Sequence, residues 1–261
     1  MKAGVSTACL YPELTETALY ALAAGGIKTT EIFVNSPSEL EEDYIRSLRG
    51  ILDRYGMEVV SLHPFTSGIE PLMLFSDYER RYWDMLEFCR RYFHAMNLLG
   101  ASIFVLHGDH RGSLCTDERY FERYAGLFRL GREYSVTVAQ ENVQRCRSSS
   151  PDFLQRMRSA LGSEAAFVVD LKQAIRSGCD VYEVLDAVGD GLCNLHVSDS
   201  APGKDCLPIG EGRFDFPKLA AYLAERGYKG ALLVELYREN YPDVESLIES
   251  YRRLGEIIHK L

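Results

Sequence analysis

Ionisable side chains end most of the short apolar runs in this sequence. The runs VVSLH, FVLH, VAQE, FVVD, CNLH and LLVE each pass from apolar residues to a single ionisable one. Their final residues are His63, His107, Glu141, Asp170, His196 and Glu235. A strand that is buried on both faces is expected to be apolar throughout. Because six runs share this polar ending, the pattern indicates a common site where the strands end.

Three carboxylates and one imidazole in this series form a plausible metal-ligand set. Carboxylates that converge at one point repel each other, and a cation is the usual way to stabilise them. We therefore expect one divalent metal ion, Mn²⁺, Mg²⁺, Co²⁺ or Zn²⁺, bound by Glu141, Asp170, His196 and Glu235. Structural roles are the alternative: Asp170 could cap the helix that follows it, and Glu141 could be a buried carboxylate satisfied by a neighbour.

The elements that must position these residues alternate regularly between strands and helices. Amphipathic runs lie between β-rich runs, which occupy about 2–9, 29–34, 58–63, 102–107, 137–142, 165–170, 192–197 and 231–236. Helices are expected at about 13–26, 37–56, 77–99, 116–133, 151–161, 180–188, 216–226 and 242–260. Eight such repeats predict a (β/α)8 TIM barrel that occupies residues 1–261 as one domain. The alternative, an open doubly wound sheet, usually carries a glycine-rich loop after its first strand, whereas this chain has CLYPEL there.

Composition narrows the classes of partner. The net charge of −9 argues against a nucleic-acid partner, because nucleic-acid binders usually carry a basic face. No apolar stretch reaches the roughly 18 residues of a membrane span. The seven cysteines are scattered without a CxxC pair, which favours a reducing cytoplasm over a disulfide framework. We expect a small-molecule partner, and the sequence leaves a homo-oligomer possible.

Four segments together resemble a known family. VAQENV, VVDLKQAIRSG, NLHVSDSAPGKDCLPIGEGRFDF and LLVELY are similar to the sugar phosphate isomerases and epimerases of the xylose isomerase-like TIM barrels. That group includes ketose 3-epimerases, hydroxypyruvate isomerases and inosose dehydratases. The resemblance implies that the four residues above bind the metal and that Glu141 and Glu235 form an acid/base pair. One would remove a proton next to a ketose carbonyl, giving a cis-enediolate, and the other would return it.

The resemblance also suggests substrate contacts and shows two departures. His63 and His107 match positions that line the substrate pocket, and Arg213 could bind a phosphate or carboxylate, or form only a surface ion pair. Gln173 and Cys206 stand where many relatives have histidines, which an endonuclease branch uses for further zinc ions. Their replacement argues against DNA repair. Gln173 can still donate to a substrate hydroxyl, and Asp199 could orient a loop.

The sequence thus predicts a metal-dependent isomerase or epimerase of a small ketose, sugar phosphate or related polyol. Two alternatives stay open. A dehydratase of the inosose type would use the same metal and carboxylates to remove a proton and expel water. A non-catalytic sugar-binding barrel would bind ligand without turnover. The substrate, the metal and the oligomeric state are not identified by the residues.

Overall fold

The strands form one closed ring. The structure is a computed structural model that describes residues 1–260. Within them, eight parallel strands pair in the order β1-β10-β7-β6-β5-β4-β3-β2. Their bounds are β1 Lys2–Ser6, β2 Thr29–Phe33, β3 Glu58–His63, β4 Ile103–Leu106, β5 Thr137–Glu141, β6 Phe167–Asp170, β7 Leu192–Val197 and β10 Ala231–Val234. The ring confirms the predicted (β/α)8 barrel, and the strand ends bring the polar residues to one mouth.

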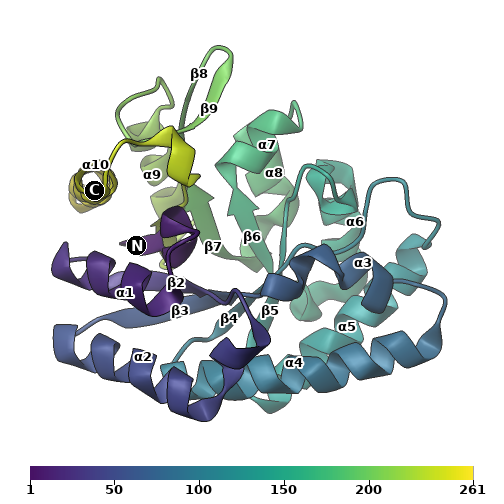
Figure 1. Ribbon diagram of the computed structural model, residues 1–261. Helices are drawn as coiled ribbons and strands as arrows, with labels where there is room; N and C mark the ends of the chain where they lie inside the picture. Colours follow the sequence, from purple (N-terminus) through teal and green to yellow (C-terminus); the bar gives the residue numbers. More distant parts are fainter. Residues whose placement is uncertain (261) are drawn as a thin grey trace.

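Helices surround the ring (Figure 1). The long helices are α1 Thr15–Ala24, α2 Glu42–Tyr55, α4 Glu79–Leu99, α5 Asp117–Glu133, α6 Pro151–Leu161, α8 Val181–Val188, α9 Phe216–Glu225 and α10 Val244–His259. Gly56 and Gly100 end α2 and α4 in the left-handed conformation, with φ of 60° and 79°, as expected of helix-stopping glycines.

One predicted helix is divided. The expected helix 37–56 is a 3₁₀ turn, Pro37–Leu40, followed by α2, because Glu41 between them is extended. The short helix α3 Glu70–Met73 was not expected, whereas α7 Leu171–Arg176 is the helix that Asp170 was expected to cap. The strands β8 Asp199–Ala201 and β9 Lys204–Leu207, which lie between β7 and α9 and form an antiparallel hairpin, were not predicted either. The hairpin projects beyond the barrel in Figure 1.

The barrel wall is tightly packed around apolar side chains. Gly4 in β1 lies so close to its neighbours that an added Cβ would come within 2.6 Å of the Thr29 carbonyl oxygen and 2.5 Å of Leu233. Only glycine therefore fits at this position. All seven cysteines are free thiols. Across residues 1–260, no helix combines the length and the apolar composition that crossing a membrane requires.

Candidate metal centre and substrate cavity

The four expected metal ligands converge at the mouth of the barrel. Glu141 and Asp170 are the last residues of β5 and β6, His196 lies near the end of β7, and Glu235 directly follows β10. One potential ligand atom from each of the four lies within 4.8 Å of those from the other three. We call this group the tetrad. The structure therefore brings together residues that are far apart in the chain, and metal binding by them remains a prediction.

His196 is held by carboxylates at both ring nitrogens. Its Nδ1 lies 2.9 Å from Glu141 Oε1 and 3.4 Å from Glu235 Oε2, while its Nε2 lies 3.0 Å from Glu31 Oε2. Burial disfavours the charged ring, but the carboxylates of Glu31 and Glu235 outweigh it and raise the pKa of His196 well above its usual value. The ring is therefore an imidazolium when no metal is bound.

Glu31 is a buried carboxylate that orients this ring from behind. It lies in β2 and is fully buried. The hydroxyls of Ser6 and Ser61 donate to its two oxygens at 2.9 and 2.7 Å. A carboxylate on the far nitrogen of a histidine is the usual outer partner of a histidine metal ligand. Glu31 thus leaves Nδ1 as the His196 nitrogen that faces the tetrad.

Lys172 places a positive charge inside the tetrad. Its Nζ lies 2.6 Å from Asp170 Oδ2 and 3.0 Å from Glu235 Oε2, and its side chain is only 3% exposed. Burial disfavours the ammonium, but Asp170 and Glu235 hold the pKa of Lys172 above its usual value. Asp170 also accepts the backbone N–H of Gln173 at 3.0 Å and so caps α7. The helix-cap role considered for Asp170 is therefore real and coexists with its place in the tetrad.

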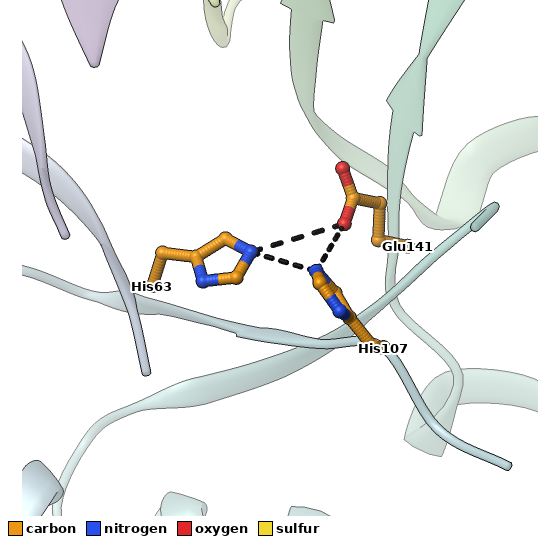
Figure 2. A group of neighbouring side chains, drawn as sticks. All are labelled: His63, His107 and Glu141. Atoms are coloured by element: carbon orange, nitrogen blue, oxygen red, sulfur yellow. Dashed lines mark hydrogen bonds and ion pairs between the residues drawn. The ribbon is translucent and has the colours of Figure 1, made fainter. Parts of the chain in front are cut away.

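Two histidines extend the network from Glu141 (Figure 2). His63 Nε2 and His107 Nε2 are 2.8 Å apart, and His107 Nε2 lies 3.0 Å from Glu141 Oε2. Arg145 Nη2 donates to His107 Nδ1 at 2.9 Å, so in this geometry the His107 proton lies on Nε2 and points to Glu141. Burial lowers the pKa of His63 to about 4. His63 is therefore neutral, and its ring stacks on Phe33 at a centroid distance of 4.6 Å.

A cavity of about 460 Å³ opens beside the tetrad. Glu141 and Glu235 line it, whereas Asp170 and His196 do not. Aromatic residues from four separate parts of the chain cover other parts of the wall: Tyr11, Phe33, Phe65 and Tyr237. A mixture of aromatic rings and a few convergent polar groups is typical of a small-molecule site. Of the tetrad, the two glutamates are thus the members that line this cavity.

Three of the four expected substrate-binding residues line the same cavity. They are His63, His107 and Gln173. Arg213 is not among the lining residues; its backbone N–H donates to the Ser200 carbonyl at 2.7 Å, and its role stays a prediction.

Asp199 and Cys206 have structural roles near the cavity. The Asp199 carboxylate accepts the backbone N–H groups of Gly210, Gly212 and Phe214, at 2.9 to 3.0 Å, as expected of a residue that orients a loop. Cys206 is buried, and its Sγ accepts the Tyr237 N–H at 3.3 Å. Burial raises the pKa of this thiol, as is usual for an unreactive cysteine.

The roles of three polar residues of the site were not predicted. Glu31 was recognised as a polar residue of the second predicted strand, TTEIFV, but no partner was assigned to it. Lys172 stands among the polar residues of a helix start, where lysine is usually solvated. Arg145 lies in a loop without any pattern. Only the folded chain places them around the tetrad.

The tetrad fits a divalent ion. Carboxylate oxygens and one oriented imidazole nitrogen lie close enough to surround a single point. The buried Lys172 ammonium shows in addition that the cluster needs positive charge to be stable. The ion would be held by the four residues of the tetrad. Lys172 would then have to share or release the two oxygens that it contacts, Asp170 Oδ2 and Glu235 Oε2.

Comparisons with known proteins point to one family. A sequence model of the xylose isomerase-like TIM barrel family matches residues 19–257. The chain is 25% identical over 260 residues to an uncharacterized protein of Mycobacterium leprae, covering 90% of this chain and 89% of that protein. It is 24% identical over 209 residues to fructoselysine 3-epimerase of Escherichia coli O157:H7, covering 76% and 75% of the two chains.

Solved structures share the fold over the whole chain. A D-tagatose 3-epimerase-like protein superposes with a TM-score of 0.82 and 22% identity, covering 100% of this chain and 99% of the other. The IolI protein, solved with a bound zinc atom, gives a TM-score of 0.78 and 17% identity, with coverage of 100% and 99%. At these identities the likeness establishes the barrel and leaves the chemistry to the residues of the site.

Proposed function

Because this chain belongs to the xylose isomerase-like TIM barrel family, we propose that it is a divalent-metal-dependent isomerase or epimerase of a small ketose or ketose derivative. The observation that carries the proposal is the division of the tetrad. Glu141 and Glu235 line the cavity, while Asp170 and His196 are not among its lining residues. The two members of the tetrad that line the cavity are thus both carboxylates, the groups that a proton abstraction and return would need.

The chain supplies the groups for proton transfer from two sides. Glu141 ends β5 and Glu235 follows β10, and β6 and β7 lie between these strands in the ring. Despite burial, hydrogen bonds from His107 and His196 hold the pKa of Glu141 well below its usual value. Burial likewise opposes the charge of Glu235, but the charges of Lys172 and His196 lower its pKa to about 2. Both groups are therefore ionised at neutral pH, which is the form that a proton abstraction requires.

A bound divalent ion would polarise a ketose carbonyl and acidify the adjacent C–H bond. One glutamate would then take the proton and the other would supply one to the opposite face. His107 fixes the orientation of Glu141 through its Nε2–H. The epimerase names of the fructoselysine and D-tagatose relatives support an epimerase over other isomerisations, and the zinc in the IolI structure supports a divalent ion.

The test is a screen for exchange of substrate C–H protons with solvent. Ketoses and ketose phosphates would be incubated in heavy water with Mn²⁺ and followed by NMR. We expect exchange with the wild-type protein and a loss of roughly 100-fold or more in Glu141→Gln and Glu235→Gln. Glu183→Gln, which changes an exposed glutamate on α8, is the matched control and should behave as wild type.

Two results would count against the proposal. Absence of exchange on every ketose, with metal bound and the fold intact, would reject it. Loss of water without return of the starting sugar would instead assign the dehydratase reaction to the same residues.

A further inference from the structure

The cavity wall contains an arginine without a carboxylate partner. Arg145 lies in the loop after β5 and lines the cavity. Its guanidinium has five N–H donors, and within residues 1–260 the only acceptor it meets is His107 Nδ1, at 2.9 Å. Arg176, the last residue of α7, is by contrast paired with Asp205 at 2.6 Å. Arg145 thus presents a positive charge and unused donors to the cavity.

Gln173 adds a second donor to the same wall. The backbone N–H of Gln144 donates to Gln173 Oε1 at 2.9 Å, so the amide oxygen is already used. The other end of this amide, Nε2, has no acceptor in the part of the chain that the structure describes. We call Arg145 and Gln173 the donor wall. A wall that offers N–H groups without acceptors suits an anion better than a neutral hydroxyl.

The donor wall is separated from the proton-transfer carboxylate Glu141 by the ring of His107. Only the His107 ring stands between the Arg145 guanidinium and Glu141, because His107 bonds Glu141 through Nε2 and Arg145 through Nδ1. A small ketose with its reacting carbon at Glu141 and Glu235 would therefore bring its far end to this wall.

We propose that the donor wall binds an anionic group, a phosphate or a carboxylate, at the end of the substrate remote from the reacting carbon. The substrate would then be an anionic ketose. That it is a ketose rests on the proposed function, and that it is anionic rests on the donor wall. Arginine is the side chain best suited to such a group, because its fork-shaped donors match two oxygens of a phosphate or carboxylate.

The experiment compares three ketohexoses that differ only at C6. D-fructose, D-fructose 6-phosphate and D-fructuronate carry a hydroxyl, a phosphate and a carboxylate there. Dissociation constants would be measured by isothermal titration calorimetry on the Mn²⁺-loaded protein. We expect wild type to bind at least one anionic sugar more tightly than fructose. Arg145→Gln should weaken that binding by about 10-fold or more and leave fructose within about twofold.

Variants separate the roles of Arg145. Arg145→Lys, which keeps the charge without the fork, should retain part of the preference. Arg132→Gln, at an exposed arginine in the last turn of α5, is the matched control and should change nothing. If Arg145→Gln weakens all three sugars equally, Arg145 acts only by positioning His107, and the anion subsite is refuted. Failure of wild type to prefer either anionic sugar refutes it as well.

Deuterium exchange on the same sugars separates this inference from the proposed function. Exchange without any preference for the anionic sugars would overturn the subsite and leave the isomerase proposal standing. An anion preference that depends on Arg145, without exchange on any sugar, would support the subsite and count against the isomerase. The more strongly Arg145-dependent of the two anionic sugars identifies the group, phosphate or carboxylate.

Discussion

Replacing Lys172 by methionine should tighten metal binding. In the metal-free protein, the ammonium occupies two oxygens of the tetrad, Asp170 Oδ2 at 2.6 Å and Glu235 Oε2 at 3.0 Å. A divalent ion bound to the same oxygens must displace these hydrogen bonds and tolerate a positive neighbour. Methionine has a similar length and no charge, so it removes the competitor while filling much of the space.

The size of the effect follows from the charges. At a separation of about 4 Å and an effective dielectric constant of about 20, two unit charges interact by about 4 kcal/mol. The flexible lysine stem lets the ammonium withdraw when metal binds, which removes much of this repulsion. We therefore expect Mn²⁺ to bind Lys172→Met about 10- to 100-fold more tightly than wild type, equivalent to about 1.4–2.8 kcal/mol.

The same change should destabilise the metal-free protein. Asp170 and Glu235 lose their counter-ion, and breaking a buried ion pair costs about 3–5 kcal/mol. Added Mn²⁺ should then raise the melting temperature of the variant more than that of wild type, because the stabilisation by a ligand of the native state grows with the logarithm of its affinity.

Titration calorimetry measures the affinity for Mn²⁺. Thermal unfolding with and without Mn²⁺ measures the loss of stability in the metal-free variant and its recovery when Mn²⁺ binds. Lys229→Met, at an exposed lysine in the turn before β10, is the control. If Lys172→Met folds and binds Mn²⁺ no more tightly than wild type, the reasoning is refuted. Lys172 would then be a residue that organises the metal ligands.

Three further predictions concern the groups around the tetrad. Mn²⁺ affinity should rise with pH, because the carboxylates around His196 raise its pKa and the metal must displace the proton on Nδ1. Calorimetry in buffers of different ionisation enthalpy should detect proton release on binding. Binding without proton release would contradict this prediction. Glu31→Gln should weaken Mn²⁺ binding by about 10- to 100-fold through loss of the outer partner of His196, whereas an unchanged affinity would show that Glu31 is not needed to orient the ring. Burial raises the pKa of Glu70 to about 7. Between the unfolded and native pKa values the native state binds more protons than the unfolded state, so stability falls as pH rises through this range and the loss is complete above it. Glu70→Gln should therefore leave the free energy of unfolding nearly unchanged at pH 4 and raise it by on the order of 1–3 kcal/mol at pH 8, as denaturant titrations at both pH values would show.

The barrel and the tetrad were predictable for the same reason. A parallel strand that is buried on both faces has to be apolar along its length, so the polar residue at its end stands out in the sequence. Asp170 after FVV and Glu235 after ALLV are examples. The eight-fold alternation then implies that these ends meet at one mouth, which is where the structure places them.

Residues whose roles depend on a single distant partner were not predictable. Lys172 is an ordinary residue of a helix start until β10 brings Glu235 within 3.0 Å of it. Arg145 becomes part of the cavity only through the path of its loop. The β8–β9 hairpin was not predicted because strands of three and four residues are too short to show a periodic pattern.

The order of the tetrad along the chain has a consequence for protein synthesis. Glu141, Asp170 and His196 precede α9, but Glu235 follows β10, the strand that pairs with both β7 and β1 and closes the ring. A nascent chain that has not yet emerged from the ribosome beyond α9 therefore has neither a closed barrel nor the fourth ligand. The metal ion that we propose can be held by all four residues only after β10 has emerged.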